Sequence, residues 1–287
     1  MKKYNMIIDV AKCHDCNNCF LACKDEYIEN DFPPYSVAQP WHGHRWMNIM
    51  RKERGQYPRV DVAYRPTPCM HCDEAPCMNV GKEGAVYKRE DGIVIIDPEK
   101  AKGEKGLMEA CPYGVIWWNE EKDVPQKCTF CAHLLDDGWE EPRCVQACPT
   151  GALKFIRADD AEMKEIIASE DLEVYLPESQ TNPRVYYKNL YRYSACFIAG
   201  SIALQDTDEC AEGAVITLSN GSKGFSEKTE TNNYGDFKID NLEESSGEYT
   251  LEIDLEGYDS KILPVHLKES INLGTIFLAL STGGVKT

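Results

Sequence analysis

The sequence has no long hydrophobic run. Its longest mostly apolar stretch, Phe197–Leu204, is far shorter than the roughly 20 residues that cross a bilayer as a helix, so no transmembrane helix is expected. A signal peptide is not expected either, because the first cysteine motif begins at Cys13, before an apolar core could form. We therefore expect a cytoplasmic protein, unless it is exported together with a partner that carries the signal.

Basic residues are also few. The chain has 31 Lys and Arg against 48 Asp and Glu, a net charge of −17. Phosphate groups would be repelled, which argues against nucleic acid and anionic membrane surfaces as partners. With 287 residues, of which 43% are hydrophobic and 28% charged, the composition is that of a globular protein with room for two or three small domains.

Cysteine, by contrast, is abundant, with fourteen residues. Disulfides are rare in a reducing compartment, so most of these thiols are expected to bind a metal or a cluster. Twelve of them fall into four groups: Cys13-x2-Cys16-x2-Cys19-x3-Cys23, Cys69-x2-Cys72-x4-Cys77, Cys111-Pro112, and Cys128-x2-Cys131-x12-Cys144-x3-Cys148-Pro149. Cys196 and Cys210 stand apart and are expected to be inert thiols.

The first group distinguishes iron–sulfur clusters from zinc. Tetrahedral zinc often takes two CxxC pairs, and the four cysteines of the last group, Cys128 to Cys148, would allow that alternative. The first group does not, because three cysteines at three-residue spacing followed by a fourth match the bacterial ferredoxin run. Proline after Cys111 and Cys148 agrees with this, since it turns the chain just after a remote ligand.

In the ferredoxin run the fourth cysteine binds the other cluster of the pair. Pairing the first group with the last therefore predicts three [4Fe–4S] sites that use all twelve cysteines. Cluster A takes Cys13, Cys16, Cys19 and Cys148; cluster B takes Cys23, Cys128, Cys131 and Cys144; cluster C takes Cys69, Cys72, Cys77 and Cys111.

A fourth site is expected beside cluster C, but its ligands are missing. By the same spacing they would stand at Gly81, Ala101, Glu104 and Leu107, and none of these is cysteine. A whole ligand set is lost while no other ligand is. The pattern indicates an ancestor with two modules and four sites, one of which has been lost.

These motifs resemble the four-cluster iron–sulfur subunits of the dimethyl-sulfoxide-reductase superfamily of molybdopterin oxidoreductases. The resemblance covers about residues 1–157. It is carried by CHDCNNCFLACKDE (13–26), PCMHCDEAPC (68–77), GAVYKREDGIVIIDPEK (84–100), ACPYGVI (110–116) and PQKCTFCAHLLDDGW-EEPRCVQACPTGAL (125–153). The nested pairing of ligands given above is the one that this family uses.

The resemblance implies an electron-transfer subunit without catalytic residues of its own. Its partner would be a large catalytic subunit that holds molybdenum and molybdopterin guanine dinucleotide, in a heterodimer or larger complex. The chain departs from the family in three ways: it lacks the fourth cluster, it shows no membrane anchor, and it has an additional C-terminal domain. A stand-alone polyferredoxin, a subunit of another soluble molybdopterin enzyme and a purely structural subunit remain alternatives.

The expected fold class is α+β, with two bacterial-ferredoxin-like cluster modules, one with a lost site, followed by an all-β sandwich. Residues 1–23 and 125–157 would form the module of clusters A and B, and residues 69–124 the module of cluster C. Residues 24–68 are an insertion and 158–195 a connector.

Four segments allow local predictions. Residues 84–97 are expected to form two strands around a turn at Asp91-Gly92, and residues 114–118 a buried strand. Residues 98–110 and 160–169 are expected to be helical. In the insertion, His42, His44 and Trp46 are expected to pack over a cluster or against a partner rather than to bind metal.

From Cys196 the composition changes to short β-rich runs separated by turn signals, which predicts a sandwich over residues 196–287. TNNYGDFKIDNL and YTLEIDLEGY resemble domains of the transthyretin-like and carboxypeptidase-regulatory type. His266 alternates with apolar residues and is interpreted as structural.

Overall fold

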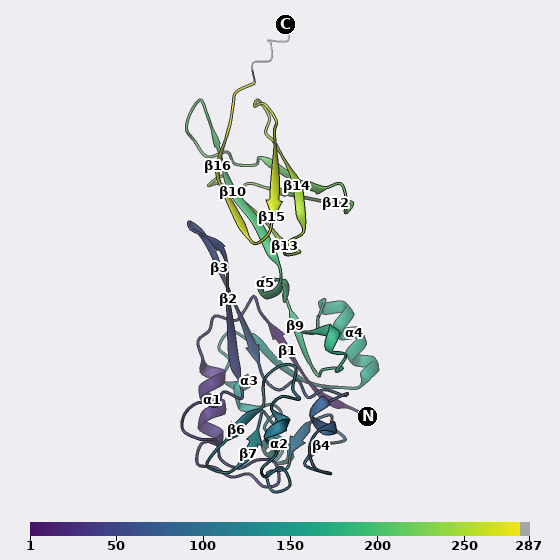
Figure 1. Ribbon diagram of the computed structural model, residues 1–287. Helices are drawn as coiled ribbons and strands as arrows, with labels where there is room; N and C mark the ends of the chain where they lie inside the picture. Colours follow the sequence, from purple (N-terminus) through teal and green to yellow (C-terminus); the bar gives the residue numbers. More distant parts are fainter. Residues whose placement is uncertain (282–287) are drawn as a thin grey trace. The chain divides into compact units, whose positions relative to one another are not determined.

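The computed structural model describes residues 1–281, and the chain divides into two compact units (Figure 1). Unit 1 consists of Met1–Arg51 and Tyr64–Leu190. Unit 2 consists of Lys52–Ala63 and the chain from Tyr191 onward. The last six residues of the predicted sandwich, 282–287, lie outside the described residues.

Unit 1 contains one three-stranded sheet with β1 (Lys3–Asp9) in the middle. β8 (Leu153–Ala158) pairs with it antiparallel, and β9 (Val185–Lys188) pairs with it parallel. β1 therefore joins the region of the last cysteine group to a segment predicted only as a connector. Its Met6 and Ile8 are fully buried, as expected for a central strand.

The predicted helix over residues 160–169 is confirmed as α4 (Asp160–Glu170). Asp159 caps it, because its carboxylate accepts hydrogen bonds from two N–H groups of the first turn, while its own backbone N–H donates to the carboxylate of Glu162. This capping box satisfies donors that the helix itself leaves free. Met163 on the inner face packs against Ile7 and Leu172.

The cysteine-bearing part of unit 1 is built from short elements. Its helices are α1 (Asn18–Tyr27), η1 (Pro76–Asn79), η2 (Lys105–Leu107), α2 (Ala132–Asp136) and α3 (Arg143–Gln146). Its short strands are β4 (Val86–Lys88), β5 (Val94–Ile96), β6 (Trp117–Asn119) and β7 (Val124–Gln126). A further single turn, η3 (Pro177–Ser179), precedes β9.

The hairpin predicted over residues 84–97 is confirmed, with β4 and β5 paired antiparallel. The strand predicted at 114–118 begins only at Trp117, although Val115 and Ile116 before it are buried. The helix predicted over 98–110 is wrong. That segment forms turns and one 3₁₀ turn, because Gly103 adopts a φ of +80°, which an α-helix cannot accommodate.

The insertion after α1 contains two strands that were not predicted from the sequence. β2 (Asn48–Gln56) and β3 (Arg59–Thr67) form a two-stranded sheet. Their residues nearest the connecting turn, Lys52–Ala63, belong to unit 2. Of the three residues expected to pack over a cluster or against a partner, His44 and Trp46 are buried and His42 is exposed.

Unit 2 is a two-layer β structure, as predicted for the C-terminal region. After the short helix α5 (Tyr191–Ser194), one sheet has the order β13-β10-β16 and the other β12-β11-β14-β15. The strands are β10 (Cys196–Leu204), β11 (Val215–Asn220), β12 (Phe225–Glu230), β13 (Asp236–Leu242), β14 (Gly247–Asp254), β15 (Lys261–Leu267) and β16 (Ile271–Leu278).

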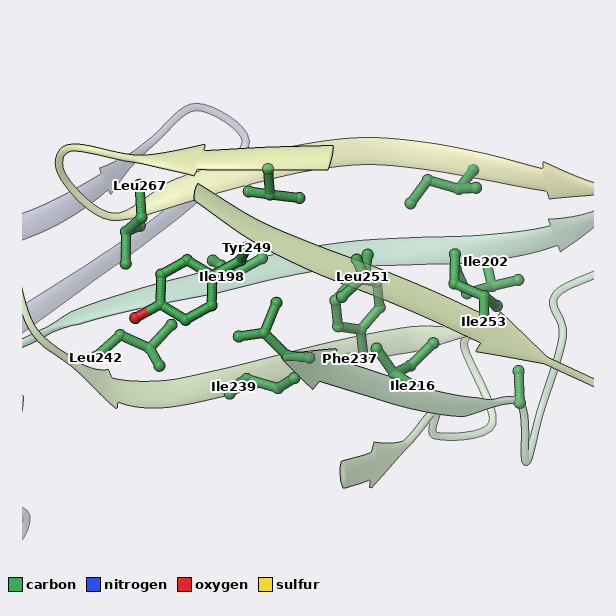
Figure 2. Close-up of a cluster of buried hydrophobic side chains, with 14 of the residues drawn as sticks. Ile198, Ile202, Ile216, Phe237, Ile239, Leu242, Tyr249, Leu251, Ile253 and Leu267 are labelled. Carbon is green, nitrogen blue, oxygen red and sulfur yellow. The ribbon is translucent and has the colours of Figure 1, made fainter. Parts of the chain in front are cut away.

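The core of unit 2 lies between these sheets. Figure 2 shows Tyr249, Leu251 and Ile253 of β14 among side chains from the other strands, such as Ile198 and Phe237. Along β14 these three residues are buried and the intervening ones are exposed or half-buried. This alternation is what a strand with one buried face requires.

Unit 2 also contains a buried ionic network. The Arg54 side chain is only 2% exposed, and its guanidinium donates to Asp61 at 2.6 Å and to Asp240 at 2.9 Å. Lys238 joins both carboxylates, at 3.0 and 2.7 Å. Partial burial alone would raise the pKa of Asp61, but hydrogen bonds from Arg54 and Lys238 outweigh that effect and hold it well below its usual range.

Candidate iron–sulfur sites

The first group of cysteines gathers around the loop between β1 and α1. It combines Cys13, Cys16 and Cys19 with the distant Cys148, which follows α3. Burial raises the pKa of Cys19 to about 12, and the neighbouring Cys13 and Cys148 contribute. Burial also acts to raise the pKa of Cys148, but hydrogen bonds from the Thr150 hydroxyl and from backbone N–H groups lower it overall.

The second group lies between α1 and α3, which pack against each other. It combines Cys23 of α1 with Cys128, Cys131 and Cys144. All four thiols are buried. Burial raises the pKa of Cys128 to about 12 and that of Cys131 to about 11. The pKa values of Cys23 and Cys144 are raised by burial and by the other thiols of this group.

The third group lines one small cavity in unit 1, with a volume of about 20 Å³. Cys69, Cys72, Cys77 and Cys111 all contribute to its wall, together with Met70, Val94, Ile116 and Lys127. Burial raises the pKa of Cys72 to about 12 and that of Cys77 to about 11. The structure thus brings the cysteines of each of the three sets near one another.

The three CxxC segments share a backbone turn. The second residue after the first cysteine, namely Asp15, His71 or Phe130, has a positive φ of 55°, 45° or 53°. Its N–H group donates to the sulfur of that first cysteine, at 3.5 Å for Cys69 and 3.4 Å for Cys128. A turn of this kind presents two thiolates on the same side while stabilising their charge.

These residues fit a [4Fe–4S] cluster. All fourteen cysteines are free thiols, and the four of each set stand close enough to influence one another's ionisation. Buried thiolates repel one another unless a cationic core holds them. Among residues 1–281, no group of three or more His, Cys, Asp or Glu side chains is placed to hold a single metal ion. A multinuclear cluster needs wider ligand spacing than one ion.

The four positions of the expected lost site also come together in part. Ala101 and Leu107 are fully buried, and a Cβ on Gly81 would lie 3.3 Å from a methyl group of Leu107. Glu104 forms an ion pair with Lys82 at 3.0 Å. Apolar packing and an exposed ion pair therefore stand where ligands would be.

The backbone at this position keeps the shape of a cysteine turn. Gly103 stands two residues after Ala101, the place that Asp15, His71 and Phe130 occupy in the other segments, and it too has a positive φ, of +80°. This also explains why the helix predicted there does not form.

Several groups beside the cysteines were not predicted from the sequence. The Tyr27 hydroxyl, which hydrogen-bonds to Thr129 at 2.7 Å, acts to lower the pKa of Cys131, and the Thr181 hydroxyl, which hydrogen-bonds to Tyr113 at 2.6 Å, acts to lower that of Cys72. Both are buried, and both come from segments remote from those cysteines in sequence. No spacing rule could have found them. Lys127 could have been noticed, because it directly precedes Cys128.

The remaining cysteines lie in unit 2. Cys196 is buried at the start of β10, and Cys210 is exposed. Neither is joined to another cysteine. His266, also in unit 2, is exposed on β15 and contacts Glu248 at 2.7 Å.

Two domain families match the chain. A 4Fe-4S dicluster domain matches residues 60–158, and a carboxypeptidase regulatory-like domain matches residues 198–275. The first covers most of the cysteine groups, and the second covers the sandwich of unit 2. The matches support the α+β class and a cluster-binding region followed by a regulatory-type β domain.

A relative extends over nearly the whole chain. The pyrogallol hydroxytransferase small subunit of Pelobacter acidigallici is 52% identical over 281 residues, which cover 97% of this chain and all of the relative. A putative iron–sulfur subunit of dimethyl sulfoxide reductase from Halobacterium salinarum is 34% identical and matches 66% of this chain and 80% of its own length. The chain belongs to the iron–sulfur subunits of the dimethyl-sulfoxide-reductase superfamily.

As a member of these iron–sulfur subunits, the chain binds [4Fe–4S] clusters and transfers electrons. A further relative, the iron–sulfur subunit of arsenate respiratory reductase from Shewanella sp., is 31% identical and matches 64% of this chain and 95% of its own length. Within residues 1–281, no helix is both long and apolar enough to cross a membrane.

Proposed function

We propose that the chain carries three [4Fe–4S] clusters and exchanges electrons with a catalytic partner subunit. The observation that carries the proposal is the assembly of three four-cysteine sets, each of which joins neighbouring cysteines to one from a distant segment. Clusters A, B and C would be held by the ligand sets predicted from the spacing. When bound, the clusters supply one-electron transfer, and the protein sets their potentials through hydrogen bonds, burial and charge.

The absence of a fourth cluster is supported by the packing around Leu107. Gly103 keeps the positive-φ turn that the other cysteine segments have, but Gly81, Ala101 and Leu107 supply no thiol at the ligand positions. The two-module arrangement proposed for residues 1–23 with 125–157, and for 69–124, follows from this pairing. In that arrangement residues 24–68 are the insertion and 158–195 the connector.

The partner we propose is a large subunit that holds molybdenum and molybdopterin guanine dinucleotide. The 52% identity to a pyrogallol hydroxytransferase small subunit favours hydroxyl transfer between polyhydroxybenzenes, pyrogallol and phloroglucinol, as the reaction of the complex. That reaction is redox-neutral overall, so the clusters would prime or buffer the molybdenum centre. Free cysteines throughout favour the reducing cytoplasm as the location of this complex.

Iron and sulfide analysis of the chain in its purified complex tests the cluster count. We expect about twelve irons per chain, four for each cluster. The Cys77→Ser variant should fall to about eight, whereas Cys196→Ser, a matched change at a buried cysteine outside the sets, should stay at twelve. A wild-type value near eight, or equal loss in both variants, would contradict the assignment.

Co-purification tests the partner. The chain is expected to elute from gel filtration with a molybdenum-containing subunit, and the complex to convert pyrogallol to phloroglucinol in the presence of a polyhydroxybenzene co-substrate. A chain that is stable and fully loaded on its own would favour a polyferredoxin. A complex that reduces or oxidises another substrate would favour a different molybdopterin enzyme.

A further inference from the structure

The cavity of the third cysteine set contains a buried cation. Lys127 lines it together with all four cysteines of that set, and the residue is only 2% exposed. Lys127 also directly precedes Cys128, a cysteine of the second set. The Lys127 side chain therefore lies beside cysteines of two proposed clusters, B and C.

The protein holds this ammonium group in place without neutralising it. Nζ donates to the carbonyl oxygens of Val94 at 2.5 Å and of Cys128 at 3.2 Å. A lysine has three N–H donors, so one proton has no protein acceptor among residues 1–281. Within the same residues, no carboxylate forms an ion pair with Lys127.

Two other cations near the cysteine sets, Lys88 and Arg143, are paired with carboxylates, whereas Lys24 beside Cys23 donates to uncharged oxygens. Lys88 donates to the carbonyl of Cys72 at 2.7 Å, but it also forms an ion pair with Asp73 at 2.8 Å. Arg143, whose backbone N–H bonds to Cys131, is paired with Glu26 at 3.2 Å. Lys127 thus differs from both in keeping an uncompensated charge.

We propose that Lys127 raises the reduction potential of cluster C, so that C is reduced more readily than it would be in a neutral cavity. The inference rests on the proposed function, because it requires a cluster bound by Cys69, Cys72, Cys77 and Cys111. A cluster with four thiolates is anionic, and an added electron makes it more so. A fixed positive charge in a dry cavity stabilises the reduced form more than the oxidised form.

The influence on the cysteines agrees with this placement. Burial raises the pKa of Cys77, and the Lys127 ammonium is the strongest opposing influence. The same ammonium also opposes the raised pKa of Cys128, after several other groups. It does not appear among the main influences on Cys13 or Cys19 of the first set. Because the Lys127 side chain lines the cavity of the third set, the effect should be largest at cluster C, smaller at B and absent at A.

Redox titration followed by electron paramagnetic resonance tests the proposal on the full chain in its purified complex. The midpoints of clusters C and A are first assigned with Cys77→Ser and Cys16→Ser. Lys127→Gln, which keeps a donor for Val94, and Lys127→Met, which does not, both remove the charge. Each is expected to lower the reduced-to-oxidised ratio of cluster C at fixed potential about tenfold. For a one-electron couple this means that the midpoint potential of cluster C falls by about 59 mV.

Lys88→Gln is the matched control, because it removes a lysine that already has a carboxylate partner. Its shift should be clearly smaller, and the cluster A midpoint should not move in any of these variants. The proposal is overturned if the cluster C midpoint is unchanged in either neutral variant that retains its iron. It is also overturned if both neutral variants lose cluster C while Lys127→Arg keeps it, since the lysine then serves assembly rather than tuning.

Failure of the proposed function gives a different result. In that case the wild-type protein would contain about eight irons, or its electron paramagnetic resonance spectrum would show no signal that is lost in Cys77→Ser. A wild-type protein with three clusters and unshifted midpoints in the Lys127 variants would refute only the role of Lys127.

Discussion

The two units of this protein have different kinds of core. Unit 2 has a continuous apolar core between two sheets, which seventeen buried residues fill. In unit 1, no helix or strand between Cys69 and Cys148 is longer than five residues, and the same stretch contributes eight of the twelve grouped cysteines. Elements this short bury little apolar surface on their own, and small folds of this kind rely on bound metal for much of their stability.

The comparison teaches that stability and function are coupled in one unit and separate in the other. In unit 1, the groups that would carry electrons also hold the chain together. In unit 2, the core residues are ordinary hydrophobic side chains, and the fold should form without iron. Four measurements test this contrast, from the largest expected effect to the smallest.

Removal of iron should affect the units most unequally. Oxidation with ferricyanide in the presence of a chelator is expected to unfold the cysteine-bearing part of unit 1, because buried thiols that repel one another as thiolates lose their cationic core. Hydrogen exchange read by mass spectrometry should show loss of protection for α1 and α3, with protection retained in β10 and β14. Equal loss in all four elements would refute the contrast.

Loss of Arg54 should destabilise unit 2 strongly. In Arg54→Gln the half-buried carboxylates of Asp61 and Asp240 lose their main partner, and breaking an ion pair with a buried group from one side costs about 3–5 kcal/mol. Arg59→Gln is the matched control, because Arg59 is 42% exposed and its pair with Asp236 is worth about 0–1 kcal/mol. Urea unfolding followed by exchange in β11 measures both, and the iron content should remain unchanged.

Truncation of the sandwich core should have a slightly smaller effect. Leu251 is fully buried on β14, and Leu251→Ala is expected to cost about 3 kcal/mol of unit 2 stability through lost contacts and a residual cavity. Ile262→Ala, at a residue 63% exposed on the neighbouring strand, should change it by less than about 0.5 kcal/mol. If Leu251→Ala also lowered the iron content, the two units would not be independent in stability.

Acid should weaken unit 2 gradually. The pKa values of Asp61 and Asp240 are lowered in the folded state, because Arg54 and Lys238 outweigh the effect of burial. Their contribution to stability is therefore fully present above the unfolded-state pKa of about 4 and is lost as the pH falls through the lower folded values. The difference in unfolding free energy between wild type and Arg54→Gln should stay constant down to about pH 4 and shrink as the pH falls further. A difference that stays constant below that pH would contradict this cause.

Much of this arrangement could be predicted from the sequence, because covalent spacing and side-chain alternation are local. The CxxC turns, the β4–β5 hairpin, α4 and the strands of the sandwich all follow from patterns within about a dozen residues. The three cysteine sets, which join distant segments, were predicted only because ferredoxin ligation has a known rule for its remote ligand.

The features that were not predicted correctly depend on contacts between distant segments or on backbone conformation. The parallel pairing of β9 with β1 has no local signature, so the segment looked like a connector. The residues at 98–110 have helical composition apart from two glycines, but Gly103 is held in a left-handed turn. The burial of Arg54 was not predicted, because one of its two carboxylate partners, Asp240, is far away in the sequence.

One feature of the first cysteine set bears on how the protein must be handled. Of the twelve grouped thiols, Cys16 alone is exposed, and its companions Cys13 and Cys148 are half-buried. Dioxygen would reach that corner before any other, so aerobic preparations should bleach in stages, starting there. An iron count near eight after work in air would then describe damage, and only anaerobically prepared samples can report how many clusters the chain was built to hold.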